Sequence, residues 1–140
     1  MKIGFTCGSW DLVHAGHILV FKEAKEHCDY LIVGLQSNPH IDRAEKNTPV
    51  MTISERYLIL RSVKYIDEII PYETEKELHN LLRAIHPDIR FIGEDWKGKQ
   101  YTGYELDIPM YFQRREHDFS TTELRERVFN AEYEKRNNHI

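Results

Sequence analysis

The chain has 140 residues and a formal net charge of −4, with 41% hydrophobic and 30% charged residues. This length and composition predict one domain with a packed core. The acidic balance argues against nucleic-acid binding, which needs a basic excess, and no run of 18 apolar residues could cross a membrane. The N-terminus shows no signal-peptide pattern, and the two cysteines form no disulfide or metal-binding framework, so a cytoplasmic setting is expected.

The first third of the chain predicts a strand, a helix and a second strand. The apolar segment 2–7 predicts a strand, and the spacing of apolar residues predicts a helix over 15–27. This helix is expected to have one buried stripe with a solvent-exposed edge, formed by Ile18, Leu19, Phe21, Ala24 and Lys25. The nearly continuous apolar run 29–35 is typical of a strand that is buried on both faces of a parallel sheet. Together the three segments predict a right-handed crossover unit.

Three capping boxes organise the rest of the chain. In each, a Ser or Thr is followed three residues later by Glu, a pattern that satisfies free N–H groups at a helix start. The boxes at 52–55, 74–77 and 120–123 predict helices over 53–64, from 75 up to Pro87, and up to residue 133. The remaining strands are expected at 67–71, 89–93 and 108–112, the last at a sheet edge because it contains Pro109. The polar loop 36–51 is long enough to be a functional lid.

The alternation of strands and helices predicts an α/β fold, an open parallel sheet of about five strands with helices on both faces. The expected organisation is a single domain over 1–133 and a polar tail over 134–140. In such sheets ligands bind beyond the carboxyl ends of the strands, where the strand order reverses. The loops that carry the candidate functional residues all follow strands, so they are expected at that edge.

The segment from Gly8 to His17 joins the first strand to the first helix. A helix N-terminus attracts anions, and Gly16 lets a ligand approach the backbone closely. His14 and His17 are three residues apart, so they are expected on one face of the first turn, where imidazoles could stabilise a developing oxyanion. Two alternatives stay open. A zinc site would have only two ligands here, and the histidines could simply cap the helix.

Other candidate residues also allow two interpretations. Lys46 could close over triphosphate oxygens or be a solvated lysine, and Asp11 could bind a metal through water, orient the histidines or only shape a turn. Asp95 and Trp96 could contact a ribose and stack on a base, or form a polar turn with an anchoring aromatic ring. The segment from Arg114 to Thr122 could form a second anion cradle at a helix start, although Ser120 alone would be an ordinary N-cap.

The segment Gly8-Ser9-Trp10-Asp11 through His14-Ala15-Gly16-His17 resembles the His-x-Gly-His signature of the nucleotidyltransferase superfamily. It is most similar to cytidylyltransferases of the glycerol-3-phosphate cytidylyltransferase type. Two further motifs of that family follow in the same order, Gly93-Glu94-Asp95-Trp96 and Ser120-Thr121-Thr122. The chain departs from the family pattern at Ser9-Trp10, where Thr-Phe is usual, at Asn38, where Asp is common, and at Asp118, which replaces a glycine.

This resemblance implies a Rossmann-like fold, a homodimer, and transfer of CMP from CTP to a phosphorylated small alcohol such as glycerol 3-phosphate. Mg²⁺ would bridge triphosphate oxygens, with no direct protein ligand predicted. An adenylyltransferase that uses ATP and a non-catalytic nucleotide sensor are the alternatives. The catalytic residues implied are His14, His17, Lys46, Arg115 and Thr121. Nucleotide binding is expected from Cys7, Gly8, Ser9, Trp10, Gly16, Gly93, Asp95, Trp96, Ser120 and Thr122, and substrate binding from Asp11, Asn38 and Arg56.

Overall fold

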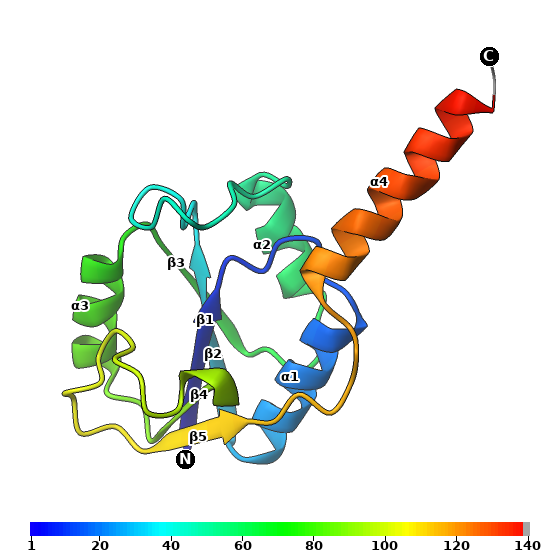
Figure 1. Cartoon of the computed structure of the whole chain (residues 1–140). Helices are drawn as coiled ribbons and strands as arrows, with labels where there is room; N and C mark the ends of the chain where they lie inside the picture. The colour runs from blue at the N-terminus through cyan, green and yellow to red at the C-terminus, as the bar shows by residue number, and fades with distance from the viewer. Residues whose placement is uncertain (139–140) are drawn as a thin grey trace.

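Five parallel strands form one sheet in the order β3-β2-β1-β4-β5 in the computed structural model, which describes residues 1–138 (Figure 1). The strands are β1 (Ile3–Gly8), β2 (Tyr30–Gln36), β3 (Glu68–Tyr72), β4 (Ile89–Gly93) and β5 (Met110–Gln113). The chain moves outward from β1 to β3 and then crosses back to add β4 on the other side of β1. The strand order therefore reverses between β1 and β4, and the predicted Rossmann-like α/β sheet is confirmed.

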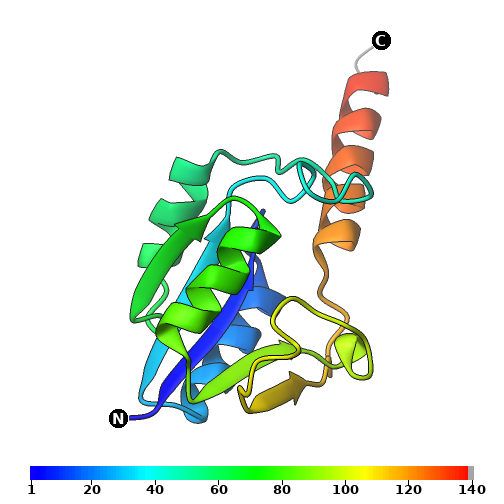
Figure 2. The same ribbon diagram turned by 90° about the vertical axis from the view of Figure 1, so that its left-hand side faces the viewer.

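Helices cover both faces of the sheet (Figures 1 and 2). The helices are α1 (Ala15–Glu26), α2 (Ile53–Arg61), α3 (Glu75–Ile85) and α4 (Thr121–Asn137), and a short 3₁₀ turn, η1 (Glu94–Trp96), follows β4. One core cluster joins Phe21 of α1 and Leu60 of α2 to alternate residues of β2, and a second joins Leu82 of α3 to Phe5 and Ile32. Strand β2 thus has apolar residues buried on both faces, as its sequence predicts.

Three element boundaries differ from the sequence prediction by two residues or more. Strand β5 begins at Met110 rather than residue 108, because Pro109 has no N–H to donate and contributes only its carbonyl, which accepts from the Arg90 N–H at 2.9 Å. Helix α2 ends at Arg61 rather than residue 64. Helix α4 continues to Asn137, so residues 134–137 of the predicted tail are helical, and residues 139–140 lie outside the described part of the chain.

The surface of α1 also differs from expectation at one position, and α4 exposes apolar side chains. On α1, Phe21 is fully buried, but Leu19, expected on the buried stripe, is 42% exposed. Helix α4 extends away from the sheet (Figure 1), and its apolar side chains Val128, Phe129 and Tyr133 are exposed. In the described residues, none of the helices combines the length and apolar character that spanning a membrane requires.

The contrast between the two α1 positions gives a test of the core. Phe21→Ala removes a ring that is 0% exposed and packed in the α1 side of the core, so we expect the free energy of unfolding to fall by about 3–5 kcal/mol. Leu19→Ala on the same helix should change it by no more than about 0.5 kcal/mol, because Leu19 already contacts solvent. Urea unfolding of both variants measures the difference, and equal losses would contradict this assignment of the core.

Candidate active site

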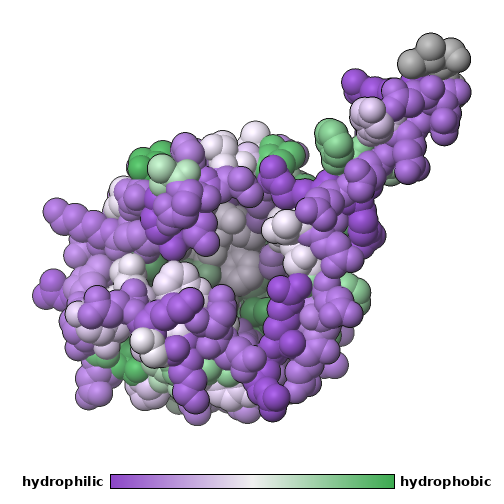
Figure 3. All heavy atoms as spheres, in the orientation of Figure 1, coloured by the Kyte–Doolittle hydropathy of each residue, from purple (hydrophilic) through white to green (hydrophobic). Residues whose placement is uncertain are grey.

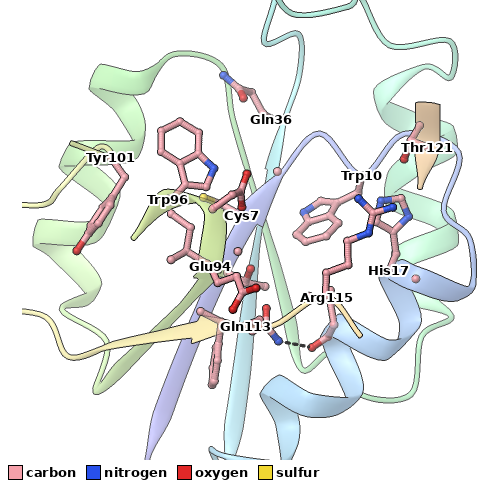
Figure 4. A pocket seen from close by; sticks show the side chains of 18 of the residues that line it. Cys7, Trp10, His17, Gln36, Glu94, Trp96, Tyr101, Gln113, Arg115 and Thr121 are labelled. Atoms are coloured by element: carbon pink, nitrogen blue, oxygen red, sulfur yellow. Dashed lines mark hydrogen bonds between the residues drawn. The ribbon is translucent and has the colours of Figure 1, made fainter. Parts of the chain in front are cut away.

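A cleft of about 850 Å³ opens at the carboxyl ends of β1 and β4, where the strand order reverses. Figure 3 shows it as a hollow in the middle of one face, with a largely hydrophilic rim. Figure 4 shows that Trp10, His17, Arg115 and Thr121 lie on one side of the cleft, and that Trp96 and Tyr101 lie on the other. The sequence-predicted residues that line it are Cys7, Gly8, Trp10, His14, Gly16, His17, Lys46, Gly93, Asp95, Trp96, Arg115, Ser120 and Thr121.

The turn between β1 and α1 has an unusual backbone. Trp10 and Leu12 have φ angles of 51° and 50°, in the left-handed region that costs a side-chain-bearing residue about 1–2 kcal/mol. Trp10 compensates through its buried ring, whose Nε1–H donates to the Gly34 carbonyl at 2.9 Å. The same ring packs against Phe21 and meets His17 edge-on, with centroids 4.7 and 5.6 Å away. Trp10 therefore fixes the turn that carries the two motif histidines.

His14 and His17 cap α1 reciprocally. His14 is the N-cap, and its Nδ1 accepts from the Gly16 N–H at 3.0 Å. His17 is three residues further on, and its Nδ1 accepts from the His14 N–H at 3.2 Å. The two rings lie 4.0 Å apart, centroid to centroid. The histidines can therefore cap the helix and belong to the site at the same time. Each ring uses one nitrogen for the cap and also lines the cleft.

These bonds set the chemical state of the two rings. A neutral imidazole whose Nδ1 accepts a hydrogen bond carries its proton on Nε2, so each ring has an N–H donor left for another group. Burial, together with the neighbouring His14, lowers the pKa of His17 to about 4. Burial also lowers the pKa of His14, together with the nearby positive charges of His117 and Arg115. Both rings are therefore neutral donors near pH 7.

The N-terminus of α4 reaches the same place from the other end of the chain. His14 Nε2 lies 3.2 Å from Thr121 Oγ1, so two helix starts that are 107 residues apart in sequence meet at one cleft. Ser120 is the N-cap of α4, and its hydroxyl accepts from the Glu123 N–H at 3.1 Å. The predicted reciprocal bond from the Glu123 side chain is not formed in the described structure, so the capping box is half complete. The two helix starts that are expected to hold anions therefore border the same cleft.

Asp11 and Arg56 lie outside the cleft lining, in contrast to their predicted contact with substrate. The buried carboxylate of Asp11 accepts from the N–H groups of Val50 and Met51 at 2.8 and 3.0 Å. Arg56 is 2% exposed, and its guanidinium donates to the main-chain carbonyls of Ser9, Gln36, Ser37 and Met51. The structure therefore assigns both residues the task of tying the loop that carries Lys46 to the ends of β1 and β2.

Three more predicted residues are not among those that line the cleft. The Ser9 carbonyl accepts from Arg56, and the Asn38 Oδ1 accepts from the His40 N–H at 3.0 Å, so each supports a loop. Thr122 follows Thr121 in the first turn of α4 and does not line the cleft either. In residues 1–138 no three or more His, Cys, Asp or Glu side chains gather in a way that could hold a metal ion.

A wall on the α3 side of the cleft was missed by sequence reasoning. Glu75, at the start of α3, pairs with Arg43 from the β2–α2 loop at 3.0 Å and accepts from the Thr102 hydroxyl at 3.0 Å. Arg90 of β4 donates to the Thr102 carbonyl, and its guanidinium lies 5.4 Å from the centre of the Tyr101 ring. Arg90 is predicted in a strand, and Glu75 in a capping box, so neither carried a signal for a ligand site.

A family model described as cytidylyltransferase-like matches residues 5–127. The chain belongs to the cytidylyltransferase-like family. This membership puts it in the nucleotidyltransferase superfamily. Two curated relatives are proteins named "Bifunctional protein HldE": that of Wolinella succinogenes is 36% identical over 75% of this chain, and that of Helicobacter pylori 32% over 91%. The chain spans only 22% and 27% of their lengths.

Solved structures support the same fold. A lipopolysaccharide core biosynthesis protein from Thermoplasma volcanium matches with a TM-score of 0.66 and 23% identity, over 85% of this chain and 99% of that one. Pantothenate synthetase from Thermus thermophilus matches with a TM-score of 0.58 and 12% identity, over 81% of this chain and 55% of that one. At these sequence identities the likeness shows a shared fold and nothing about function.

The buried arginine gives a prediction that separates structural from substrate-binding roles. Arg56→Met leaves four main-chain carbonyls without their donors, so we expect the free energy of unfolding to fall by about 3–5 kcal/mol. Arg61→Met, on the exposed side of the same helix, is the control and should cost no more than about 0.5 kcal/mol. Urea unfolding is the measurement. Normal stability combined with a raised KM would show instead that Arg56 contacts substrate.

His17 gives a prediction about pH. Its pKa is about 4 in the folded protein and near 6.5 when exposed, so between these values the unfolded chain binds more protons. The contribution of His17 to stability is complete above pH 6.5 and falls as the pH drops toward 4, by about 2–3 kcal/mol over the window. In His17→Asn, the amide oxygen can still accept from the His14 N–H but does not titrate. The urea midpoint of this variant should fall less steeply from pH 7 to 4.5 than that of the wild type, and parallel curves would refute the assignment.

Proposed function

We propose that this chain transfers CMP from CTP to a phosphorylated small alcohol, with glycerol 3-phosphate as the first acceptor to test. The products are a CDP-alcohol and pyrophosphate. The observation that supports this most directly is the meeting of the α1 and α4 N-termini, with His14 Nε2 3.2 Å from Thr121 Oγ1 in the cleft at the switch point. Two helix starts that converge on one cleft favour a ligand with several phosphates.

The chemistry asks little of the protein beyond positioning and charge stabilisation. A phosphate oxygen of the acceptor attacks the α-phosphorus in line, and the bond from that phosphorus to the pyrophosphate oxygen breaks. A phosphate monoester is already ionised and nucleophilic near neutral pH, so no general base and no covalent intermediate is required. Mg²⁺ that accompanies the triphosphate would neutralise part of the charge on its oxygens.

The residues of the cleft suit separate parts of that reaction. The Nε2–H groups of His14 and His17 would donate to phosphate oxygens as charge develops in the transition state. Lys46 and Arg115 line the cleft and would bind the triphosphate, together with the hydroxyls of Ser120 and Thr121. Because the two histidines are neutral, the positive charge comes from Lys46 and Arg115.

The base-binding side of the cleft favours an amino-bearing base. Glu94, Asp95 and Trp96 line this part, where the family resemblance puts the nucleotide base. Carboxylates accept hydrogen bonds, so they suit the exocyclic amino group that cytosine and adenine carry and that uracil lacks. ATP is therefore the second candidate donor, and UTP, whose base has no amino group, is disfavoured.

The decisive experiment measures pyrophosphate release with Mg²⁺, for CTP, ATP, GTP and UTP against a panel of polyol and sugar phosphates. We expect release with CTP and at least one acceptor, and a fall in kcat of about 10²–10³ in His17→Ala, which removes one donor to the developing charge. Release with ATP alone would move the chain to the adenylyltransferases. CTP binding without release from any acceptor would support the sensor alternative, and full activity in His17→Ala would refute the role of that ring.

A further inference from the structure

A third imidazole lines the cleft beside the two motif histidines. His117 lies in the segment between β5 and α4, and its ring lies next to Gly16 in the first turn of α1. A Cβ atom at position 16 would lie 2.8 Å from His14 Cε1, 2.9 Å from His117 Cε1 and 3.0 Å from Phe119 Cβ. Glycine at this position therefore lets the two rings approach the same turn of backbone.

His117 is held in the same way as the two motif histidines. Its Nδ1 accepts from the Phe119 N–H at 3.1 Å, and its ring stacks on the Phe119 ring at a centroid distance of 5.2 Å and an angle of 28°. Because Nδ1 accepts this N–H, Nε2 carries a ring proton. His14, His17 and His117 all use Nδ1 to accept a backbone N–H, from Gly16, His14 and Phe119 respectively.

This shared arrangement matters because the hydrogen bonds that cap α1 use main-chain N–H groups that could otherwise bind a phosphate. The N–H groups of His14 and Gly16 are bonded to imidazole nitrogens, so they are not free to hold a phosphate. The Nε2–H group of His17 is left as a donor at the start of α1, whereas His14 Nε2 lies 3.2 Å from Thr121 Oγ1. His117 Cε1 and His14 Cε1 lie 2.9 and 2.8 Å from the same Cβ position at residue 16, so the two side chains act on the same small region.

The position of His117 relates it to one end of the nucleotide. Arg115 and Thr121, which flank it in sequence, lie on the side of the cleft that also carries His17, opposite Trp96 and Tyr101 (Figure 4). If the base lies at Trp96, as the proposed function has it, the triphosphate extends from there toward the start of α4. The β- and γ-phosphates, which depart as pyrophosphate, then come nearest to His117.

We propose that His117 is a further catalytic residue, whose Nε2–H donates a hydrogen bond to the departing pyrophosphate. This inference rests on the proposed function and deepens it. The acceptor oxygen bonds to the α-phosphorus, the bond to the bridging oxygen breaks, and its electron pair goes to the pyrophosphate. His117 stabilises that charge through a hydrogen bond and transfers no proton, so the ring is unchanged at the end of the reaction.

Two substitutions separate this role from a structural one. In His117→Asn, the amide oxygen replaces Nδ1 and can still accept from the Phe119 N–H two residues on, so the loop is kept and the Nε2–H donor is lost. In His117→Gln, the amide nitrogen can occupy the place of Nε2, so the donor is kept and the loop bond is lost. His79→Asn changes a histidine outside the cleft lining and serves as the control.

The first readout is binding of inorganic pyrophosphate and of CTP by calorimetry. We expect His117→Asn to weaken pyrophosphate binding about 10- to 100-fold, the range for loss of a hydrogen bond to a charged group, with His117→Gln and His79→Asn close to wild type. Wild-type binding in His117→Asn would overturn the proposal. Weak binding in His117→Gln alone would also overturn it, because it would show that the loop bond matters and the donor does not.

The second readout is turnover, and it keeps the two proposals distinguishable. If the wild type releases pyrophosphate and His117→Asn has an unchanged kcat and pyrophosphate inhibition constant, only the role of His117 fails. If the wild type releases none with any donor and acceptor, the proposed function fails. The binding comparison then still decides whether His117 contacts a polyphosphate.

Discussion

The site depends on one local interaction, the reciprocal capping of α1 by His14 and His17. Each ring accepts a main-chain N–H at Nδ1, at 3.0 and 3.2 Å, and this single choice has three consequences. It starts the helix, it fixes the ring orientation, and it leaves the proton on the other nitrogen. Ser, Thr and Asp caps start helices as well, but none of them leaves a neutral N–H donor for a second partner. The same two hydrogen bonds therefore start α1 and set the chemistry of the two rings.

Two buried charged residues support that arrangement from behind. Arg56 bonds four main-chain carbonyls from the ends of β1 and β2 and from the loop before α2, and Asp11 holds two N–H groups of the same loop. Asp11 also lies 3.9 Å from Arg125 of α4. Charges this deep are costly unless every donor and acceptor is satisfied, so these residues fix one conformation of the loop that brings Lys46 to the cleft.

The fold was predictable because its signals are local and repeated. The apolar run of β2, the two complete capping boxes of α2 and α3, and the strand β4 at residues 89–93 needed no knowledge of distant contacts. The cleft lining was predictable where a motif follows the carboxyl end of a strand along the chain, as at His14 after β1, Asp95 after β4 and Thr121 after β5. The homodimer and the metal remain predictions.

What sequence could not supply was the direction in which a side chain points. Asp11 and Trp10 are neighbours in one motif, yet Trp10 lines the cleft and Asp11 turns to the 50–51 backbone, because Trp10 and Leu12 take left-handed φ angles. Glu75 and Arg90 gave ordinary signals for a helix start and a buried strand. Their place in the cleft wall follows from long-range contacts with Arg43 and Thr102, which no local pattern encodes.

Charge shows the same limit of sequence reasoning. The chain carries a net charge of −4, which by itself argues against a polyanionic ligand. The cleft, however, is lined by five Lys or Arg residues and only three Asp or Glu residues, so its local balance is positive. The chain thus combines an acidic surface, which disfavours nucleic acids, with a cationic cleft that suits a small polyphosphate. The neutral imidazoles of His14 and His17 complete the cleft, because they can donate hydrogen bonds without adding positive charge.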